Sequence, residues 1–221
     1  MKKIYLALSD TLALLVHDDV VDIAGNQKGL IRIGLPGGRS ALPLIQGILS
    51  CPQDILSRLR LYLVDERLSE DTNFNTLYKA GLEEAFNKGI LKPDQLIVPK
   101  VGHPFIENEG ELSLLYLGVG EDGHFASLFP GSYPCLDEPG KAEVAFVDNS
   151  PKPPAGRITV TYSGFRAKAS QAKIRLLFLG EGKRMALSRL LGGREKVSTL
   201  PCSFFSLEGF SVDIVTDLKG M

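Results

Sequence analysis

The sequence lacks several features that would place it in a special class of protein. It has no tryptophan and only three cysteines, which lie far apart and form no CxxC pair: Cys51, Cys135 and Cys202. This pattern argues against a disulfide scaffold or a cysteine-ligated zinc site and favours a reducing compartment. Neither sign of charge is in excess, because 25 lysines and arginines stand against 26 aspartates and glutamates. Nonspecific binding to nucleic acid needs a basic excess, so a nucleic-acid partner is not expected.

Long apolar segments are also missing. No stretch approaches the roughly 18 apolar residues that a helix needs to cross a bilayer. The N-terminus is like a signal peptide at first, since Lys2 and Lys3 precede the apolar run Ile4–Leu8. Polar residues at 9–11 interrupt that run, and no A-x-A cleavage site follows it. The sequence therefore predicts a cytoplasmic protein that has no membrane partner.

Short apolar runs alternate with amphipathic stretches along the chain. Most runs are continuously apolar, as expected of strands that helices cover on both faces. Apolar residues recur at helical spacing between Phe74 and Phe86 and again from Lys183 to Leu191. This alternation predicts one α/β domain, residues 1–221, with a mainly parallel, doubly wound (Rossmann-like) sheet flanked by helices. The expected strands are Ile4–Leu8, Leu30–Leu35, Leu59–Val64, Leu112–Leu117, Val144–Val147, Ile158–Tyr162, Ile174–Leu179 and Val212–Thr216.

Many of the 23 glycines gather just after expected strands. Ligands of open α/β sheets bind at the carboxyl ends of the strands, so we expect the chemistry in these loops. The first loop, Pro36-Gly37-Gly38-Arg39-Ser40, leads into the apolar-periodic stretch Ala41–Leu49, with Ser40 placed to cap that helix. Two glycines and the free N–H groups of a helix start suit a phosphate, although a plain strand–turn–helix connection needs glycines too. The Walker pattern GxxxxGK[ST] is absent, which disfavours nucleoside triphosphates.

Candidate acids and a candidate base follow two other strands. The segment Val64-Asp65-Glu66-Arg67 places two carboxylates and a guanidinium at a strand end. There they can take a proton or clamp an anion, or they can merely cap the next element. His124 comes directly after the glycine-rich turn 118–123, and imidazole titrates near neutral pH, which suits a general base. Ser127 lies in no GxSxG elbow, so we expect it to pack or to start a helix.

Basic residues complete the set of candidates. Lys152 and Arg157 lie in the proline-rich segment 151–159, and Lys183 follows Gly180-Glu181-Gly182 at the start of an expected helix. A cation at that end of a helix opposes the helix dipole, and a bound anion would explain its presence there. Exposed lysines are common, so this observation alone favours an anion site only weakly.

Taken in order, these segments resemble the glucosamine-6-phosphate isomerase/6-phosphogluconolactonase family over nearly the whole chain. The most specific is GVGEDGHFASLFPG (118–131), together with VDER (64–67) and PKPPAGRIT (151–159). The ASLFPG and PKPPxxRIT parts are similar to the lactonase branch, whereas the first half of the glycine loop is similar in the amino-sugar isomerases. The phosphate turn departs from the usual GG[ST]TP of the family, because Arg39, Ser40 and Ala41 follow the two glycines.

The resemblance implies hydrolysis of 6-phospho-D-glucono-1,5-lactone to 6-phospho-D-gluconate, a step of the oxidative pentose phosphate pathway. It implies His124 as the base that activates water, with Asp65 and Arg67 as further catalytic residues in the pocket. The expected substrate contacts are Gly37, Gly38, Arg39, Ser40, Asp122, Arg157 and Lys183. We expect Asp122 to support the turn or the sugar and not the imidazole. No metal or organic cofactor is implied, and the expected partner is a phosphorylated sugar lactone.

Two other functions stay open at this point. A glucosamine-6-phosphate deaminase/isomerase would use Asp65 to shuttle a proton between carbons. A sugar-phosphate sensor would bind without turnover, although such a sensor normally needs an output domain. His124 favours catalysis over sensing, because binding alone needs no base.

Overall fold

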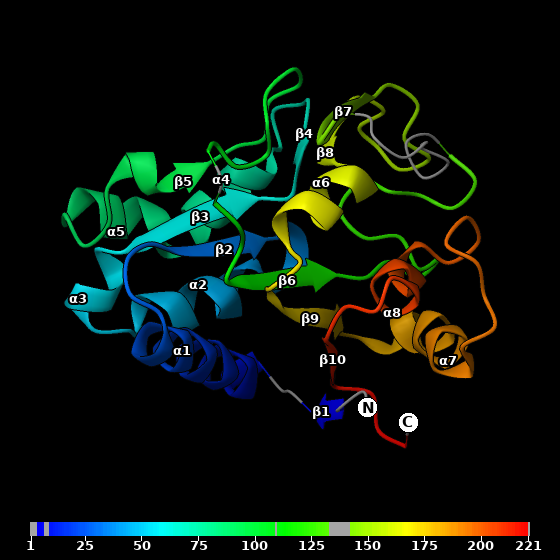
Figure 1. The fold of residues 1–221 in the computed structure, drawn as a ribbon, viewed down its shortest axis with the longest axis horizontal. Coiled ribbons are helices and arrows are strands. Elements are labelled where there is room, and N and C mark those ends of the chain that lie inside the picture. The colour runs from blue at the N-terminus through cyan, green and yellow to red at the C-terminus, as the bar shows by residue number, and fades with distance from the viewer. Residues whose placement is uncertain (1–3, 7–8, 109, 133–141, 221) are drawn as a thin grey trace.

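The computed structural model describes residues 4–6, 9–108, 110–132 and 142–220 (Figure 1). Seven of its strands form a parallel sheet in the order β1-β10-β9-β6-β2-β3-β5. The predicted α/β class with a mainly parallel sheet is therefore confirmed. The strands of this sheet are β1 (Ile4–Leu6), β2 (Ile31–Leu35), β3 (Leu59–Leu63), β5 (Leu96–Ile97), β6 (Leu114–Gly118), β9 (Lys173–Phe178) and β10 (Val212–Thr216).

A second, smaller sheet has three antiparallel strands in the order β4-β8-β7. They are β4 (Asp65–Arg67), β7 (Val144–Val147) and β8 (Arg157–Val160). Two of these strands were expected from their apolar runs, but as members of the parallel sheet. In the structure they belong to the smaller sheet instead. β4 follows β3 after one residue and pairs with β8, so this sheet lies beside the end of β3.

Helices cover both faces of the parallel sheet (Figure 1). One face carries α1 and α2 together with the α4–α5 region, and its core includes Leu12, Leu44 and Ile33. The opposite face carries α6, α7 and α8, and its core includes Phe165, Leu187 and Phe205. The α-helices are α1 (Ser9–Asn26), α2 (Ala41–Leu49), α3 (Gln53–Leu56), α4 (Asn73–Leu77), α5 (Glu83–Asn87), α6 (Tyr162–Lys168), α7 (Arg184–Gly192) and α8 (Phe204–Leu207). Short 3₁₀ turns are η1 (Gly38–Ser40), η3 (Pro93–Gln95), η4 (Glu181–Lys183) and η5 (Pro201–Ser203), and η2 (Tyr78–Leu82) is a π-turn.

Two local expectations are corrected by the structure. The stretch from Phe74 to Phe86 is not one helix, because η2 separates α4 from α5 and Gly81 has a φ of 136°. Ser40 does not cap α2 with its side chain. The chain enters that helix through η1, so Ser40 already has helical φ and ψ and its hydroxyl makes no capping hydrogen bond. That hydroxyl side chain instead lines the cavity described below.

The strand order reverses its direction between β2 and β6. From β2 the chain proceeds through β3 to β5 at one edge, and then returns to place β6 on the other side of β2. Ligands of open α/β sheets bind in the crevice outside the carboxyl ends of the strands at such a switch point. The fold thus marks the loops after β2 and β6 as the place for a site. Within the described residues no helix has the length and apolar character needed to span a membrane.

Candidate active site

A cavity of about 340 Å³ lies at the switch point. The turn Gly37–Ser40 after β2, residues 118–120 and His124 after β6, and Asp65 after β3 all line it. The predicted convergence of these three segments at one edge of the sheet is confirmed. Arg67, Arg157 and Lys183 line the same cavity, so nine of the ten expected site residues lie in its wall. Asp122 is the tenth, and it reaches the cavity through His124, as shown below.

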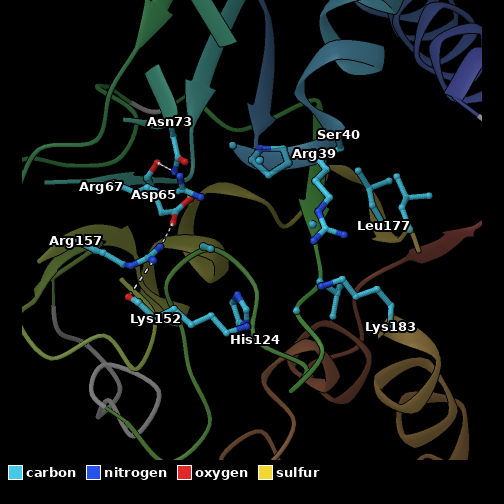
Figure 2. Close-up of a pocket in the computed structure, with 18 of the residues that line it drawn as sticks. Arg39, Ser40, Asp65, Arg67, Asn73, His124, Lys152, Arg157, Leu177 and Lys183 are labelled. Carbon is cyan, nitrogen blue, oxygen red and sulfur yellow. Dashed lines mark hydrogen bonds and ion pairs between the residues drawn. The ribbon is translucent and has the colours of Figure 1, made fainter. Parts of the chain in front are cut away.

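One end of the cavity is lined by two cationic side chains. Arg39 and Lys183 project toward one another there (Figure 2), beside the turn formed by Gly37 and Gly38. Gly38 has a φ of +80°, and a Cβ on Gly37 would lie 2.1 Å from Oδ1 of Asn73, so this turn requires glycine at both positions. Burial lowers the pKa of Lys183. The charge of Glu121 raises this pKa, the charges of Lys152 and Arg39 lower it, and the net shift is downward. A bound anion would relieve the repulsion among these cations.

His124 is hydrogen-bonded to Asp122, which corrects the expectation that this carboxylate would not contact the imidazole. Nδ1 of His124 lies 2.5 Å from Oδ1 of Asp122. A Cβ on Gly120 would lie 1.9 Å from that nitrogen, so the glycine makes the pair possible. Burial raises the pKa of Asp122, but the hydrogen bond and charge of His124 and the charge of Lys152 outweigh it and hold that pKa below its usual range. An ionised Asp122 assigns the proton to Nδ1 and leaves Nε2 as the free basic nitrogen.

Asp65 is buried, and both of its carboxylate oxygens are occupied. Asn73 donates from Nδ2 to Oδ1 at 3.0 Å, and Ser127 donates from Oγ to Oδ2 at 2.7 Å. Arg157 lies 3.9 Å from the same Oδ2. Burial raises the pKa of Asp65 above its usual value, despite the hydrogen bond from Ser127 and the charge of Arg157. This carboxylate therefore holds neighbouring groups in place through both of its oxygens.

Glu66 and Arg67, which follow Asp65, differ in the hydrogen-bonding groups that they leave for a ligand. Glu66 accepts hydrogen bonds from the amides of Arg67, Asn73 and Phe74, so it caps the start of α4, as strand-end acids often do. Arg67 pairs with the exposed Asp71 at 3.3 Å. Its Nε is buried and has no hydrogen-bond partner among the described residues. A guanidinium with an unused donor in the cavity wall suits an anionic or carbonyl oxygen of a ligand.

Two residues with a role in the site were not predicted from the sequence, and a third, Lys152, was a basic candidate that was not among the expected substrate contacts. Asn73 and Ser127 hold Asp65, and Lys152 places its ammonium 3.4 Å from Nδ1 of His124. The expectation that Ser127 packs is confirmed, because it is fully buried, but its hydroxyl also makes the hydrogen bond to Asp65. A signal for Lys152 was present, since it belongs to the PKPPAGRIT segment that carries the family resemblance.

A cationic, glycine-lined cavity at the carboxyl ends of parallel strands defines an α/β protein that can bind an anionic small molecule. The chain belongs to the family of glucosamine-6-phosphate isomerases and 6-phosphogluconolactonases, whose sequence profile matches residues 7–212. It is 30% identical over 217 residues to the 6-phosphogluconolactonase of Rattus norvegicus, a match that covers 89% of this chain and 81% of the relative.

Two further comparisons agree with this assignment. A putative 6-phosphogluconolactonase of Caenorhabditis elegans is 33% identical over 154 residues. That match covers 62% of this chain and 57% of the relative, so it spans little more than half of the nematode protein. The crystal structure of 6-phosphogluconolactonase from Leishmania guyanensis superposes with a TM-score of 0.80 over 100% of this chain and 99% of that one. Its sequence identity is only 18%, so this likeness shows the shared fold.

Proposed function

We propose that this protein hydrolyses 6-phospho-D-glucono-1,5-lactone to 6-phospho-D-gluconate. The observation that carries the proposal is the His124–Asp122 pair, which leaves a basic imidazole nitrogen in a cavity that Arg39 and Lys183 also line. Relatives named 6-phosphogluconolactonase support the same activity. A lactone is an activated ester, so water can attack it directly once a base removes a proton, and no covalent nucleophile is needed.

The reaction has two steps. Nε2 of His124 takes a proton from water as the water oxygen bonds to the lactone carbonyl carbon. The tetrahedral intermediate then expels the ring oxygen, and the imidazolium returns its proton to that oxygen. The carboxylic acid so formed releases a proton to solvent and becomes the carboxylate of 6-phosphogluconate. Asp122 keeps Nδ1 protonated and stabilises the imidazolium between the two steps. General-base assistance of this kind contributes about 10²–10⁴-fold, and the phosphate held by Arg39 and Lys183 adds the benefit of orientation.

The amino-sugar deaminase/isomerase alternative requires Asp65 to move protons between substrate carbons. Such a carboxylate must reach the substrate with a free oxygen. Asp65 is only 5% exposed, and each of its oxygens already accepts a hydrogen bond, one from Asn73 and one from Ser127. The geometry of Asp65 therefore favours the lactonase over the isomerase. A sensor that binds without turnover would have no use for a base whose tautomer is fixed by a carboxylate.

A direct assay tests the proposal. Purified protein is added to freshly generated 6-phosphogluconolactone, and the acid released is followed above the spontaneous rate. We expect proton release that is proportional to enzyme concentration, with no deamination or isomerisation of glucosamine 6-phosphate. Release at the spontaneous rate, or turnover of the amino sugar only, would overturn the proposed function.

A further inference from the structure

A cation close to the proposed base belongs to Lys152, which the sequence marked as a basic candidate but not as an expected catalytic residue or substrate contact. The Nζ of Lys152 lies 3.4 Å from Nδ1 of His124 and 3.7 Å from Oδ1 of Asp122, and Lys152 lines the cavity. Figure 2 shows its side chain extending toward the imidazole. Nδ1 already donates its proton to Asp122, so it cannot accept a hydrogen bond from Lys152. The 3.7 Å contact with Asp122 is an ion pair and lies beyond hydrogen-bond distance, so the ammonium keeps N–H donors for a ligand.

The backbone that carries this ammonium is fixed in place. Arg157 donates from Nη2 to the carbonyls of Lys152 and Pro153, at 3.2 and 3.0 Å, and from Nε to that of Pro154 at 3.2 Å. Ser150 also donates to the Lys152 carbonyl at 2.7 Å. Nε and Nη2 of Arg157 thus support the loop of Lys152, and the expected role of Arg157 as a substrate contact stays a prediction.

The support is itself anchored in the buried part of the site. Nη1 of Arg157 lies 3.5 Å from Oγ of Ser127 and 3.9 Å from Oδ2 of Asp65. Asn73 and Ser127 hold that carboxylate from either side. A continuous series of contacts therefore runs from Asp65 through Arg157 to the loop of Lys152. The side chain of Lys152 is 44% exposed, so its end can adjust to a ligand while its backbone stays fixed.

Three backbone donors of the glycine turn beside His124 are already used within the protein. The amide of Val119 donates to the carbonyl of Leu177 at 3.1 Å. Those of Gly120 and Gly123 donate to the carbonyls of His124 and Gly120, at 2.8 and 3.0 Å. These three amides of the glycine turn cannot also stabilise an oxyanion. Attack on a carbonyl beside His124 needs a donor for the negative charge that develops, and a cation in the cavity wall can supply it.

We propose that Lys152 is a further catalytic residue, whose ammonium binds the carbonyl oxygen of the lactone and then the carboxylate of the product. The inference rests on the proposed lactonase function. As the water oxygen bonds to the carbonyl carbon, the carbonyl π electrons move onto the oxygen beside Nζ. They return when the bond to the ring oxygen breaks and His124 protonates that oxygen. The site then has two cationic ends: Arg39 and Lys183 hold the phosphate, and Lys152 holds the carboxyl end.

Kinetics of Lys152→Met provide the first half of the test. Removal of a single oxyanion donor lowers kcat by about 10²–10³-fold, and we expect a loss of this size. Lys152→Arg keeps a cation at the site and should recover a large part of that loss. The matched control is Lys100→Met, at an exposed lysine outside the cavity, and it should keep the wild-type kcat. Thermal unfolding of each variant shows that folding is intact.

Binding of two open-chain ligands provides the second half. 6-Phosphogluconate carries a carboxylate where glucitol 6-phosphate carries a neutral CH₂OH group. The preference of the protein for the acid over the alcohol should fall by about tenfold or more in Lys152→Met, because a charge-assisted contact is lost. In Lys183→Met both ligands should bind more weakly while their ratio stays the same. This measurement does not depend on turnover, so it separates the role of Lys152 from the proposed activity.

The kinetic and ligand-binding results together test the catalytic role of Lys152. A wild-type protein that fails to hydrolyse the lactone overturns the proposed function, and with it the catalytic role of Lys152. If the wild type is active, Lys152→Met with a kcat within about twofold of wild type shows that the residue is not catalytic. A large loss of kcat with an unchanged ligand ratio also overturns the proposal, because Lys152 would then act on the His124–Asp122 pair and not on the carboxyl end.

Discussion

At the scale of single residues, the site depends on a carboxylate and an imidazole brought together within one turn. Asp122 and His124 are two positions apart. In a strand this spacing would place their side chains on the same face, separated by one two-residue repeat along the strand. The turn brings them to 2.5 Å because Gly123 has a φ of +86° and Gly120 leaves room for the ring. Sequence spacing alone does not show this contact, which explains why it was not predicted.

Asp122→Asn tests the pair. An amide can donate to Nδ1, which would place the proton on Nε2 and remove the basic nitrogen from the cavity. We expect kcat to fall by about 10²–10⁴-fold while the affinity for 6-phosphogluconate changes by less than about threefold. Asp148→Asn, at an exposed aspartate outside the cavity, is the control and should keep wild-type kinetics. If Asp122→Asn retains most of its activity, the hydrogen bond does not set the tautomer.

Lys183→Ala and Arg39→Ala test the phosphate end. Each removes one of the two cations that project toward one another (Figure 2). Loss of a charge-assisted contact from a partly buried site costs about 1.5–3 kcal/mol of binding free energy. We expect a higher KM in both variants, with the larger effect for Lys183, because it is half-buried while Arg39 is exposed. Unchanged KM and kcat in Lys183→Ala would show that the phosphate binds elsewhere.

At the scale of elements, a buried ion cluster fastens α1 to the parallel sheet. Asp19 of α1 accepts hydrogen bonds from Arg175 of β9, at 2.9 and 2.6 Å, and from the hydroxyl of Tyr116 of β6 at 2.9 Å. Lys173 adds an ion pair at 2.8 Å. Asp19 is 2% exposed, so its charge is stable there only because these donors surround it.

Asp19→Asn should therefore destabilise the protein without changing the site. Breaking a buried pair costs about 3–5 kcal/mol, and we expect the lower end because Arg175 keeps its ion pair with Asp213. Urea unfolding at pH 7 measures this change. The control is Asp22→Asn on the same helix, where an exposed carboxylate pairs with Lys173 and contributes less than about 1 kcal/mol. Equal effects of the two variants would contradict the account of this cluster.

The same cluster predicts how stability depends on pH. Burial raises the pKa of Asp19, but hydrogen bonds from Arg175 and Lys173 outweigh it and the pKa is lowered overall. A lowered pKa in the folded state means that the unfolded chain binds the proton more tightly. The stabilisation by the Asp19 charge is thus present above the ordinary aspartate pKa of about 3.9 and is lost as the pH falls through the folded-state value. The stability difference between wild type and Asp19→Asn should shrink as the pH is lowered below about 4.

Elements differ in how well their sequences predict them. Continuously apolar runs such as Leu114–Gly118 were predicted to within a residue or two, because strands that are buried on both faces need apolar side chains. β4 and β5 were missed, since they are three and two residues long and β4 consists of charged side chains. Pairing with β8 makes β4 a strand, and that tertiary contact has no local signal in Asp65–Arg67.

At the scale of the whole molecule, the fold class and the place of the site followed from the sequence, whereas the roles of the individual site residues did not. Parallel strands followed by glycine turns were enough to predict that Gly37, Asp65 and His124 would meet. The roles of Asp65 and Arg157 depend on the hydrogen bonds that they make to other protein groups. Only the three-dimensional structure shows these hydrogen bonds. Both residues face the cavity, yet they support other groups.

Ligand binding should stabilise the whole protein, because the cavity joins segments that follow different strands of the sheet. A ligand at 100 times its Kd adds about 2.7 kcal/mol, which corresponds to a rise in Tm of roughly 5–10 °C for a chain of this size. We expect 6-phosphogluconate to produce this shift in a thermal melt. Gluconate at the same concentration should not, since it lacks the phosphate. A similar shift with both compounds would argue against a phosphate anchor.

In the proposed reaction His124 activates the attacking water, and the kcat of His124→Asn tests this role most directly. The substitution removes proton transfer and leaves Arg39 and Lys183 in place, so kcat should fall at least about 100-fold while the affinity for 6-phosphogluconate stays within about threefold. The measurement is acid release from fresh 6-phosphogluconolactone, corrected for spontaneous hydrolysis. If His124→Asn keeps most of the wild-type rate, the histidine is structural and another group must activate the water.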